Sequence, residues 1–92
     1  MTYAYPLMIS IDPDTISYKF LDFTQLGGVC PSSAGLKGVS TEACDILRKR
    51  VIEMIVSGQE LPVPTPEDSY PSVSQDTIFS IVHIEISDAD SN

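Results

Sequence analysis

Residues 38–66 read GVSTEACDILRKRVIEMIVSGQELPVPTP, a stretch that decides the fold because it holds one helix together with both of its ends. Ser40 is a good N-cap and Glu42 places a negative charge in the first turn, so we expect the helix to begin at Thr41. Apolar residues then recur at three- and four-residue steps, in a stripe made of Cys44, Leu47, Val51, Met54 and Ile55. Gly58 ends the helix in the left-handed C′ position.

The segment after the helix is an extended connector. Residues 59–73, QELPVPTPEDSYPSV, contain four prolines, which exclude a helix and a central strand. Alternation then returns from Thr77 to Ser87, where Ile78, Val82, Ile84 and Ile86 share one face. Because Phe79 and Ile81 are also apolar, we expect a strand in the centre of a sheet.

Two strands precede the helix. Apolar residues occupy the odd positions from Tyr3 to Ile11, and Pro6 suggests an edge or early-strand position. The turn residues Asp12 to Thr15 lead into a second strand from Ile16 to Phe23, which we expect to pair with the first as a hairpin. Residues 24–39 contain four glycines, one proline and two serines and indicate a loop, with a short third strand around Gly28–Pro31.

This order of elements predicts an α+β fold. We expect a three- to four-stranded, mainly antiparallel sheet with one helix packed on one face, in the order ββ(β)αβ. Residues 1–87 form the single domain, and residues 88–92 form a disordered acidic tail.

Charge argues against nucleic acid and membranes as direct partners. The chain carries thirteen acids and five bases, a net charge of −8, which repels phosphate backbones and anionic lipids. All five bases precede Val51 and eight acids follow it, so the second half would attract a basic protein. The first residues lack the basic and apolar segments of a signal peptide, and we expect a cytoplasmic protein.

Catalysis and cofactor binding have weak support in the sequence. Cys30 and Cys44 are expected to be free thiols, with Cys44 in the helical core, and neither has a metal-ligand spacing to a neighbour. The lone His83 lies mid-strand and has no evident route to Ser32 and Ser33. We therefore predict no catalytic residue, no metal and no cofactor. The basic run from Arg48 to Arg50 spreads around the helix and is expected to be solvated.

The chain resembles the HicB-like antitoxins of bacterial toxin–antitoxin pairs. The resemblance rests on FLDF before a glycine pair, on residues 38–66, and on the closing strand TIFSIVHIEI. The matching positions are Phe20, Asp22, Gly38, Ser40, Glu42, Gly58, Leu61, Pro62 and Pro64. Cys44 stands where the family usually has alanine, Leu21 replaces a usual proline, and residues 26–36 are longer and richer in glycine and serine.

The resemblance implies a partial ribonuclease-H-like fold that binds a HicA-like toxin, a small basic protein that cleaves messenger RNA. A homodimer or higher oligomer is also expected. Many family members continue into a DNA-binding module, whereas five residues follow Ser87. We therefore expect either a stand-alone domain that sequesters the toxin without its own DNA-binding module, or a protein cut at this point. We predict partner contacts at Asp22, Phe23, Glu42 and Asp45, although turn and capping roles explain the same residues.

Two other functions compete with the antitoxin. One is a metal-dependent nuclease, in which Asp12 and Asp22, with Asp14 nearby, hold two Mg²⁺ ions about 4 Å apart. The other is a scaffold that associates with itself through an exposed strand, such as the strand after the connector.

Overall fold

The computed structural model describes residues 1–23, 25–73 and 75–86. Its elements are β1 (Thr2–Ile11), β2 (Thr15–Phe20), β3 (Gly27–Pro31), the 3₁₀ turn η1 (Ser32–Ala34), α1 (Gly35–Val56), the 3₁₀ turn η2 (Glu67–Ser69) and β4 (Thr77–Glu85). The strands form one antiparallel sheet in the order β3-β2-β1-β4. The predicted α+β fold is therefore confirmed, and so is the short third strand. The predicted tail, residues 88–92, lies outside the described residues.

The first strand is central and not at an edge, so the inference from Pro6 was wrong. β1 pairs with β2 on one side and with β4 on the other. The ladder with β2 ends at the pair Leu7–Phe20, and one residue further the Pro6 carbonyl accepts a hydrogen bond from the Leu21 N–H at 3.3 Å. The N and C=O groups of one strand residue face the same side, so the Pro6 nitrogen, which has no hydrogen to donate, faces β2 just beyond the last pair of the ladder. The proline therefore removes no hydrogen bond from within the ladder.

The last strand is an edge and not a centre, which is a second correction. β4 has β1 as its single partner in the described sheet. Apolar residues on both faces of β4 are explained without a central position. On the face away from the helix, the ring of Phe79 packs against the Tyr70 ring of the connector, with centroids 4.7 Å apart. A residue from outside the sheet thus explains an apolar position that suggested a central strand.

The core lies between α1 and one face of the sheet. The helix buries Val39, Ala43, Leu47 and Val51, four residues at four-residue steps. They pack against alternate residues of the strands, including Tyr5, Leu7, Ile9, Ile16, Tyr18, Phe20, Val82 and Ile84. Cys44, predicted in the core, is half-buried instead, because Ala43 holds the position over the sheet.

The helix begins at Gly35 and not at Thr41, because the predicted cap does not form. Its N-cap is Ala34, with no side-chain hydrogen bond. The Thr41 hydroxyl donates to the Lys37 carbonyl at 2.9 Å, four residues earlier, so the Ser-Thr pair lies inside the helix. Burial of Val39 compensates for the poor helix propensity of residues 35–40. Glu42 accordingly lies about two turns into the helix and not in its first turn.

The predicted helix end is confirmed. Gly58 has φ of +74°, a conformation that favours glycine. Its N–H donates to the Ile55 carbonyl at 3.1 Å, and the Gln59 N–H donates to the Met54 carbonyl at 2.8 Å. These two bonds form a Schellman motif, which satisfies the last carbonyls and turns the chain into the connector.

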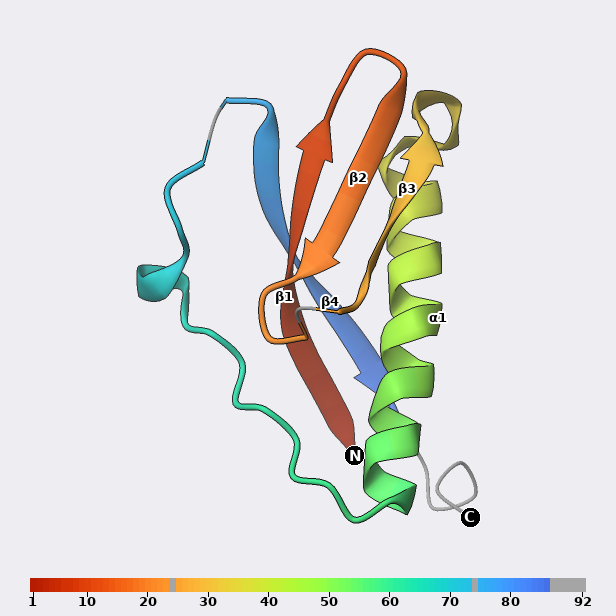
Figure 1. The fold of residues 1–92 in the computed structure, drawn as a ribbon, viewed down its shortest axis with the longest axis vertical. Helices are drawn as coiled ribbons and strands as arrows, with labels where there is room; N and C mark the ends of the chain where they lie inside the picture. Colours follow the sequence, from red (N-terminus) through yellow and green to blue (C-terminus); the bar gives the residue numbers. More distant parts are fainter. Residues whose placement is uncertain (24, 74, 87–92) are drawn as a thin grey trace.

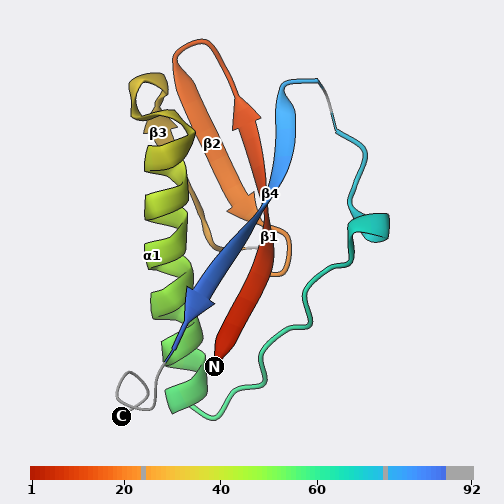
Figure 2. The ribbon, with the colours of Figure 1, turned by 180° about the vertical axis from the view of Figure 1, so that it is seen from behind.

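The helix and the connector lie along opposite sides of the sheet (Figure 1), and the view from behind shows the same arrangement (Figure 2). Apart from η2, the connector has no regular structure. It runs from the end of α1 to the start of β4, in the direction opposite to the helix. One helix therefore covers one side, and an irregular proline-rich segment accompanies the other.

The position of the core is testable with two leucines of α1. Leu47→Ala removes a fully buried side chain, and we expect it to lower the free energy of unfolding by about 2–5 kcal/mol. Leu36→Ala, at a residue that is 45% exposed in the first turn, should cost less than about 1 kcal/mol. Urea unfolding followed by circular dichroism measures both. Equal losses would contradict the core described above.

Candidate protein-binding site

Asp22 holds the connector against the end of the hairpin. It lies just beyond β2, where the loop turns towards β3. One carboxylate oxygen accepts a hydrogen bond from the Thr65 hydroxyl at 2.7 Å, and the other accepts from the Thr65 N–H at 3.0 Å. Both oxygens of this predicted partner-binding residue are thus engaged within the chain. We call this pair of bonds the Asp22–Thr65 clamp.

A second bond secures the connector nearby. The Tyr5 hydroxyl donates to the Pro62 carbonyl at 2.8 Å, which ties the central strand to the start of the connector. Burial is the main cause that raises the pKa of Tyr5, and the negative charge of Asp22 adds to it. The neutral hydroxyl is therefore a persistent donor.

Phe23 is a core residue. It is 7% exposed, and its ring meets the ring of Tyr5 edge to face with centroids 4.8 Å apart. A second edge-to-face contact joins it to Phe20 at 6.3 Å. These contacts stabilise the loop after β2. What a partner would meet near Phe23 is a cleft of about 400 Å³, to which Arg50 and Met54 of the helix also contribute.

Glu42 joins the helix to strands β2 and β3. Its carboxylate accepts a hydrogen bond from the Tyr18 hydroxyl at 2.5 Å and one from the Cys30 thiol at 3.3 Å. A Cβ on Gly28 would lie 2.8 Å from the Tyr18 hydroxyl oxygen, so the glycine leaves room for this group. Glu42 is therefore a link between α1, β2 and β3, whichever partner it meets.

Burial and the Glu42 link together keep both donors protonated. Burial, followed by the hydrogen bond and the charge of Glu42, raises the pKa of Tyr18 far above its usual value. The same causes, in the same order, raise the pKa of the Cys30 thiol. Because the thiolate is the reactive form, Cys30 is a poor nucleophile and a poor metal ligand.

Asp45 is an exposed residue on the helix surface. Its side chain is 64% exposed, and its carboxylate pairs at 3.2 Å with the ammonium group of Lys49, a side chain that is 74% exposed. An exposed pair of this kind contributes little to stability, about 0.3–0.5 kcal/mol within a helix. The Asp45 carboxylate is thus available to an incoming cation at small cost.

The four predicted residues form two groups. Glu42 and Asp45 lie three residues apart on the first half of α1. Asp22 and Phe23 share a cleft with Arg50, and Arg50 lies about 12 Å further along the helix axis than Glu42, at a rise of ~1.5 Å per residue. The structure brings each pair together and keeps the pairs apart.

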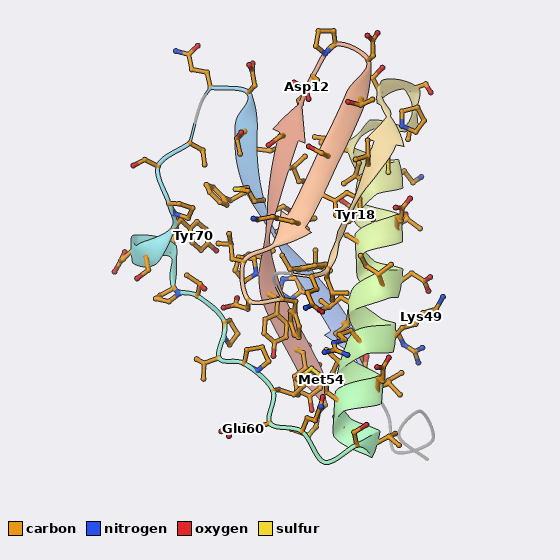
Figure 3. All side chains as sticks on the ribbon, viewed as in Figure 1. Asp12, Tyr18, Lys49, Met54, Glu60 and Tyr70 are labelled. Atoms are coloured by element: carbon orange, nitrogen blue, oxygen red, sulfur yellow. The ribbon has the colours of Figure 1, made fainter. Side chains whose placement is uncertain are left out.

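The carboxylates of the nuclease hypothesis do not converge. Asp12 lies in the hairpin turn (Figure 3), where its N–H donates to the Thr15 carbonyl at 2.9 Å. Asp22 follows the opposite end of β2, and six strand residues span about 20 Å. Two metal ions need carboxylates much closer than that. Within residues 1–23, 25–73 and 75–86, no three His, Cys, Asp or Glu side chains group as metal ligands do.

A serine nucleophile with a histidine base is also excluded by the topology. Ser32 and Ser33 form η1 directly after β3. His83 is exposed on β4, and β3 and β4 are opposite edges of the sheet. The basic residues that we expected to be solvated are paired on the surface, as with Arg50 and Glu53 at 3.1 Å.

Sequence reasoning missed a cleft between the connector and β4. It has a volume of about 450 Å³ and lies between η2, Tyr70 and residues 78–81 of the strand. Figure 3 shows Tyr70 beside η2, on the side of the sheet away from α1. The only signal in the sequence is an aromatic residue in the connector and another at an outward-facing strand position. Such a pair is not recognisable before the register is known.

Comparison with known proteins supports the fold. No protein-family model and no curated protein matches the chain. Among solved structures, one chain of a toxin–antitoxin complex from Streptococcus pneumoniae superposes with a TM-score of 0.74. The match covers 92% of this chain and 70% of that chain, at 19% sequence identity. At this identity the likeness establishes a shared fold. In addition, the described residues contain no helix long and apolar enough to cross a membrane.

The two thiols should differ in reactivity. Cys30 is buried with a raised pKa, whereas Cys44 is half-buried, so we expect iodoacetamide at pH 8 to modify Cys44 at least about tenfold faster. Mass spectrometry of tryptic peptides gives both rates. Glu42→Gln should accelerate the reaction of Cys30, because the carboxylate charge that raises its pKa is removed. Equal rates in the native protein would contradict the burial of Cys30, and an unchanged Cys30 rate in the Glu42→Gln variant would contradict the Glu42 link.

The Asp22–Thr65 clamp should protect the connector. Asp22→Ala removes both acceptors, and we expect amide hydrogens of residues 62–66 to exchange about tenfold faster. Hydrogen–deuterium exchange with mass spectrometry measures the effect. Asp12→Ala, at the opposite end of the hairpin, is the matched control and should leave exchange in the connector unchanged. Unchanged exchange in both variants would show that the clamp does not hold the connector.

Proposed function

We propose that this domain is an antitoxin-type domain, which binds and neutralises a small, basic, HicA-like toxin that cleaves messenger RNA. The observation that carries the proposal is the shared fold with a chain of a toxin–antitoxin complex. It agrees with the resemblance of residues 38–66 to the HicB-like antitoxins. We propose binding, and not catalysis, as the activity of this domain.

Electrostatics supplies the mechanism. An RNA-cleaving partner needs a positive surface to hold phosphates, and a domain with a net charge of −8 competes for that surface. The attraction accelerates association, and it weakens as salt screens the charges. Neutralisation in this proposal is steric and electrostatic, because the antitoxin occupies the surface that RNA would use.

Asp45 and Glu42 form one proposed contact, at the first half of α1. The exposed Asp45 would meet a cation of the toxin directly, while Glu42 would contribute charge from within its link to Tyr18 and Cys30. Asp22 and Phe23 form the other proposed contact, at the cleft that they line together with Arg50 and Met54 of the helix. There Phe23 would act by shaping the cleft, since its ring is buried.

The proposal is tested with the product of the reading frame adjacent to this gene. Expression of that product alone should arrest growth of a bacterial host, and co-expression of this chain should restore growth. The two proteins should also co-purify, with an affinity that falls as salt is raised. Absence of both a complex and a rescue would overturn the proposed function.

Charge reversal at α1 tests the first proposed contact. Asp45→Lys should weaken binding of that toxin about tenfold or more, measured by isothermal titration calorimetry. Glu53→Lys is the matched control, because Glu53 is also an exposed helix acid in an ion pair, with Arg50, and lies outside the proposed contact. Equal weakening by both variants would assign the effect to net charge and not to Asp45.

A further inference from the structure

We propose that the outer edge of β4, together with the cleft beside η2, binds an extended segment of the toxin as an additional strand. This inference rests on the proposed function and adds a third contact surface to the two proposed above. The segment that fits is apolar at alternate positions and carries basic residues. Strand addition of this kind uses main-chain hydrogen bonds for affinity and side-chain pockets for specificity.

The hydrogen-bond register shows which backbone groups of β4 face outwards. Met1 and Ile86 exchange two hydrogen bonds, at 2.7 and 2.8 Å, and the Ile11 N–H donates to the Asp76 carbonyl at 2.8 Å. Because bonded and non-bonded pairs alternate in an antiparallel ladder, even-numbered β4 residues face β1. The N–H and C=O groups of Phe79 and Ile81 therefore point away from the sheet. In the described chain, nothing accepts from or donates to them.

Two other residues of β4 make contacts within the chain that limit the open part of its edge. The Cys44 thiol of α1 lies 3.8 Å from the His83 carbonyl, so the helix reaches the edge near the end of the strand. Thr77 at the other end also makes contacts within the chain. The open part of the edge is thus the stretch from Phe79 to Ile81. A segment of about three to five residues suffices to pair with it.

The two edges of the sheet differ in composition. β3, at the other edge, contains two glycines and ends at Pro31, residues that weaken or block strand pairing. β4 reads TIFSIVHIE and has no glycine, proline or lysine. Ile78 and Ile81 are 38% and 45% exposed on it. Because β4 is rich in β-branched and apolar residues and lacks the residues that protect an edge, it has the composition of a strand that accepts a neighbouring strand.

The cleft supplies a pocket beside the open edge. The tilted rings of Tyr70 and Phe79, with centroids 4.7 Å apart, line it together with Ile78 and Ile81 of the strand. Its volume of about 450 Å³ accommodates one or two large apolar side chains. An added strand would place every second side chain towards this pocket.

Charge selects a basic partner over a second copy of this chain. Every charged residue from 59 to 76 is acidic, and Glu67 of η2 lines the cleft itself. Two copies pairing through β4 would bring these acids together, and like charges across an interface are unfavourable. A basic segment would instead gain from them. Charge complementarity therefore favours a basic segment of the toxin over a second copy of this chain as the occupant of the site.

Proline scanning of the edges tests the proposal without disturbing the sheet. Ile81→Pro removes an N–H that faces outwards, so the ladder with β1 keeps its bonds. We expect it to weaken binding of the adjacent-frame toxin at least about tenfold in calorimetry. Val29→Pro is the matched control, because the Val29 N–H faces outwards from β3 in the same way and the residue is 66% exposed. Its affinity should equal that of the native protein.

A second pair of variants keeps the test decisive if proline unfolds the strand. Ile81→Lys places a cation at the open edge and should also weaken binding, whereas Val29→Lys should not. Circular dichroism verifies the fold of each variant. A native protein that binds no toxin overturns the proposed function itself. A native protein whose affinity is unaffected by both Ile81 variants overturns only the β4 site, as does a native dimer that Ile81→Pro dissociates while toxin binding persists.

Discussion

The structure depends on the burial of one helical stripe against one face of a four-stranded sheet. Val39, Ala43, Leu47 and Val51 are fully buried, and they provide the helix's main contact with the strands. A single helix of about 10 Å diameter cannot cover four strands that lie about 4.8 Å apart. Coverage is consequently uneven: Ile84 is buried under the helix, whereas Ile78, on the same face of the same strand, is 38% exposed. The uncovered end of β4 follows directly from this geometric mismatch.

The connector follows the opposite side of the sheet, away from the helix. The Asp22–Thr65 clamp and the bond from Tyr5 to Pro62 fix its first half, and the Tyr70 ring rests on Phe79 near its end. Its prolines reduce the freedom that the unfolded chain would otherwise lose on folding. An irregular segment thereby acquires a defined path, and that path forms one wall of the cleft beside β4. The proposed strand-binding site at β4 is thus preorganised by residues that lie far from it in the sequence.

The sequence predicted periodic features well and long-range ones poorly. Alternation located the strands, three- and four-residue steps located the helix, and Gly58 marked its end, because each signal is local. The predicted N-cap at Ser40 was wrong because a capping serine and a serine inside a helix cannot be told apart until the burial of Val39 is known. The predicted positions of β1 and β4 in the sheet were wrong because the position of a strand depends on its neighbours. Asp22 and Glu42 were selected as contact residues, but their hydrogen bonds to Thr65, Tyr18 and Cys30 join segments whose proximity no local pattern encodes.

The glycines and proline of β3 have a consequence for assembly as a whole. A sheet with two receptive edges can grow without limit, since each added molecule presents the same edge to the next. Here Gly27, Gly28 and Pro31 make one edge unreceptive, and β4 leaves the other open. Growth by strand pairing between copies of this chain therefore stops after one step. The asymmetry between the two edges gives the domain a built-in terminus, which favours finite complexes over fibres.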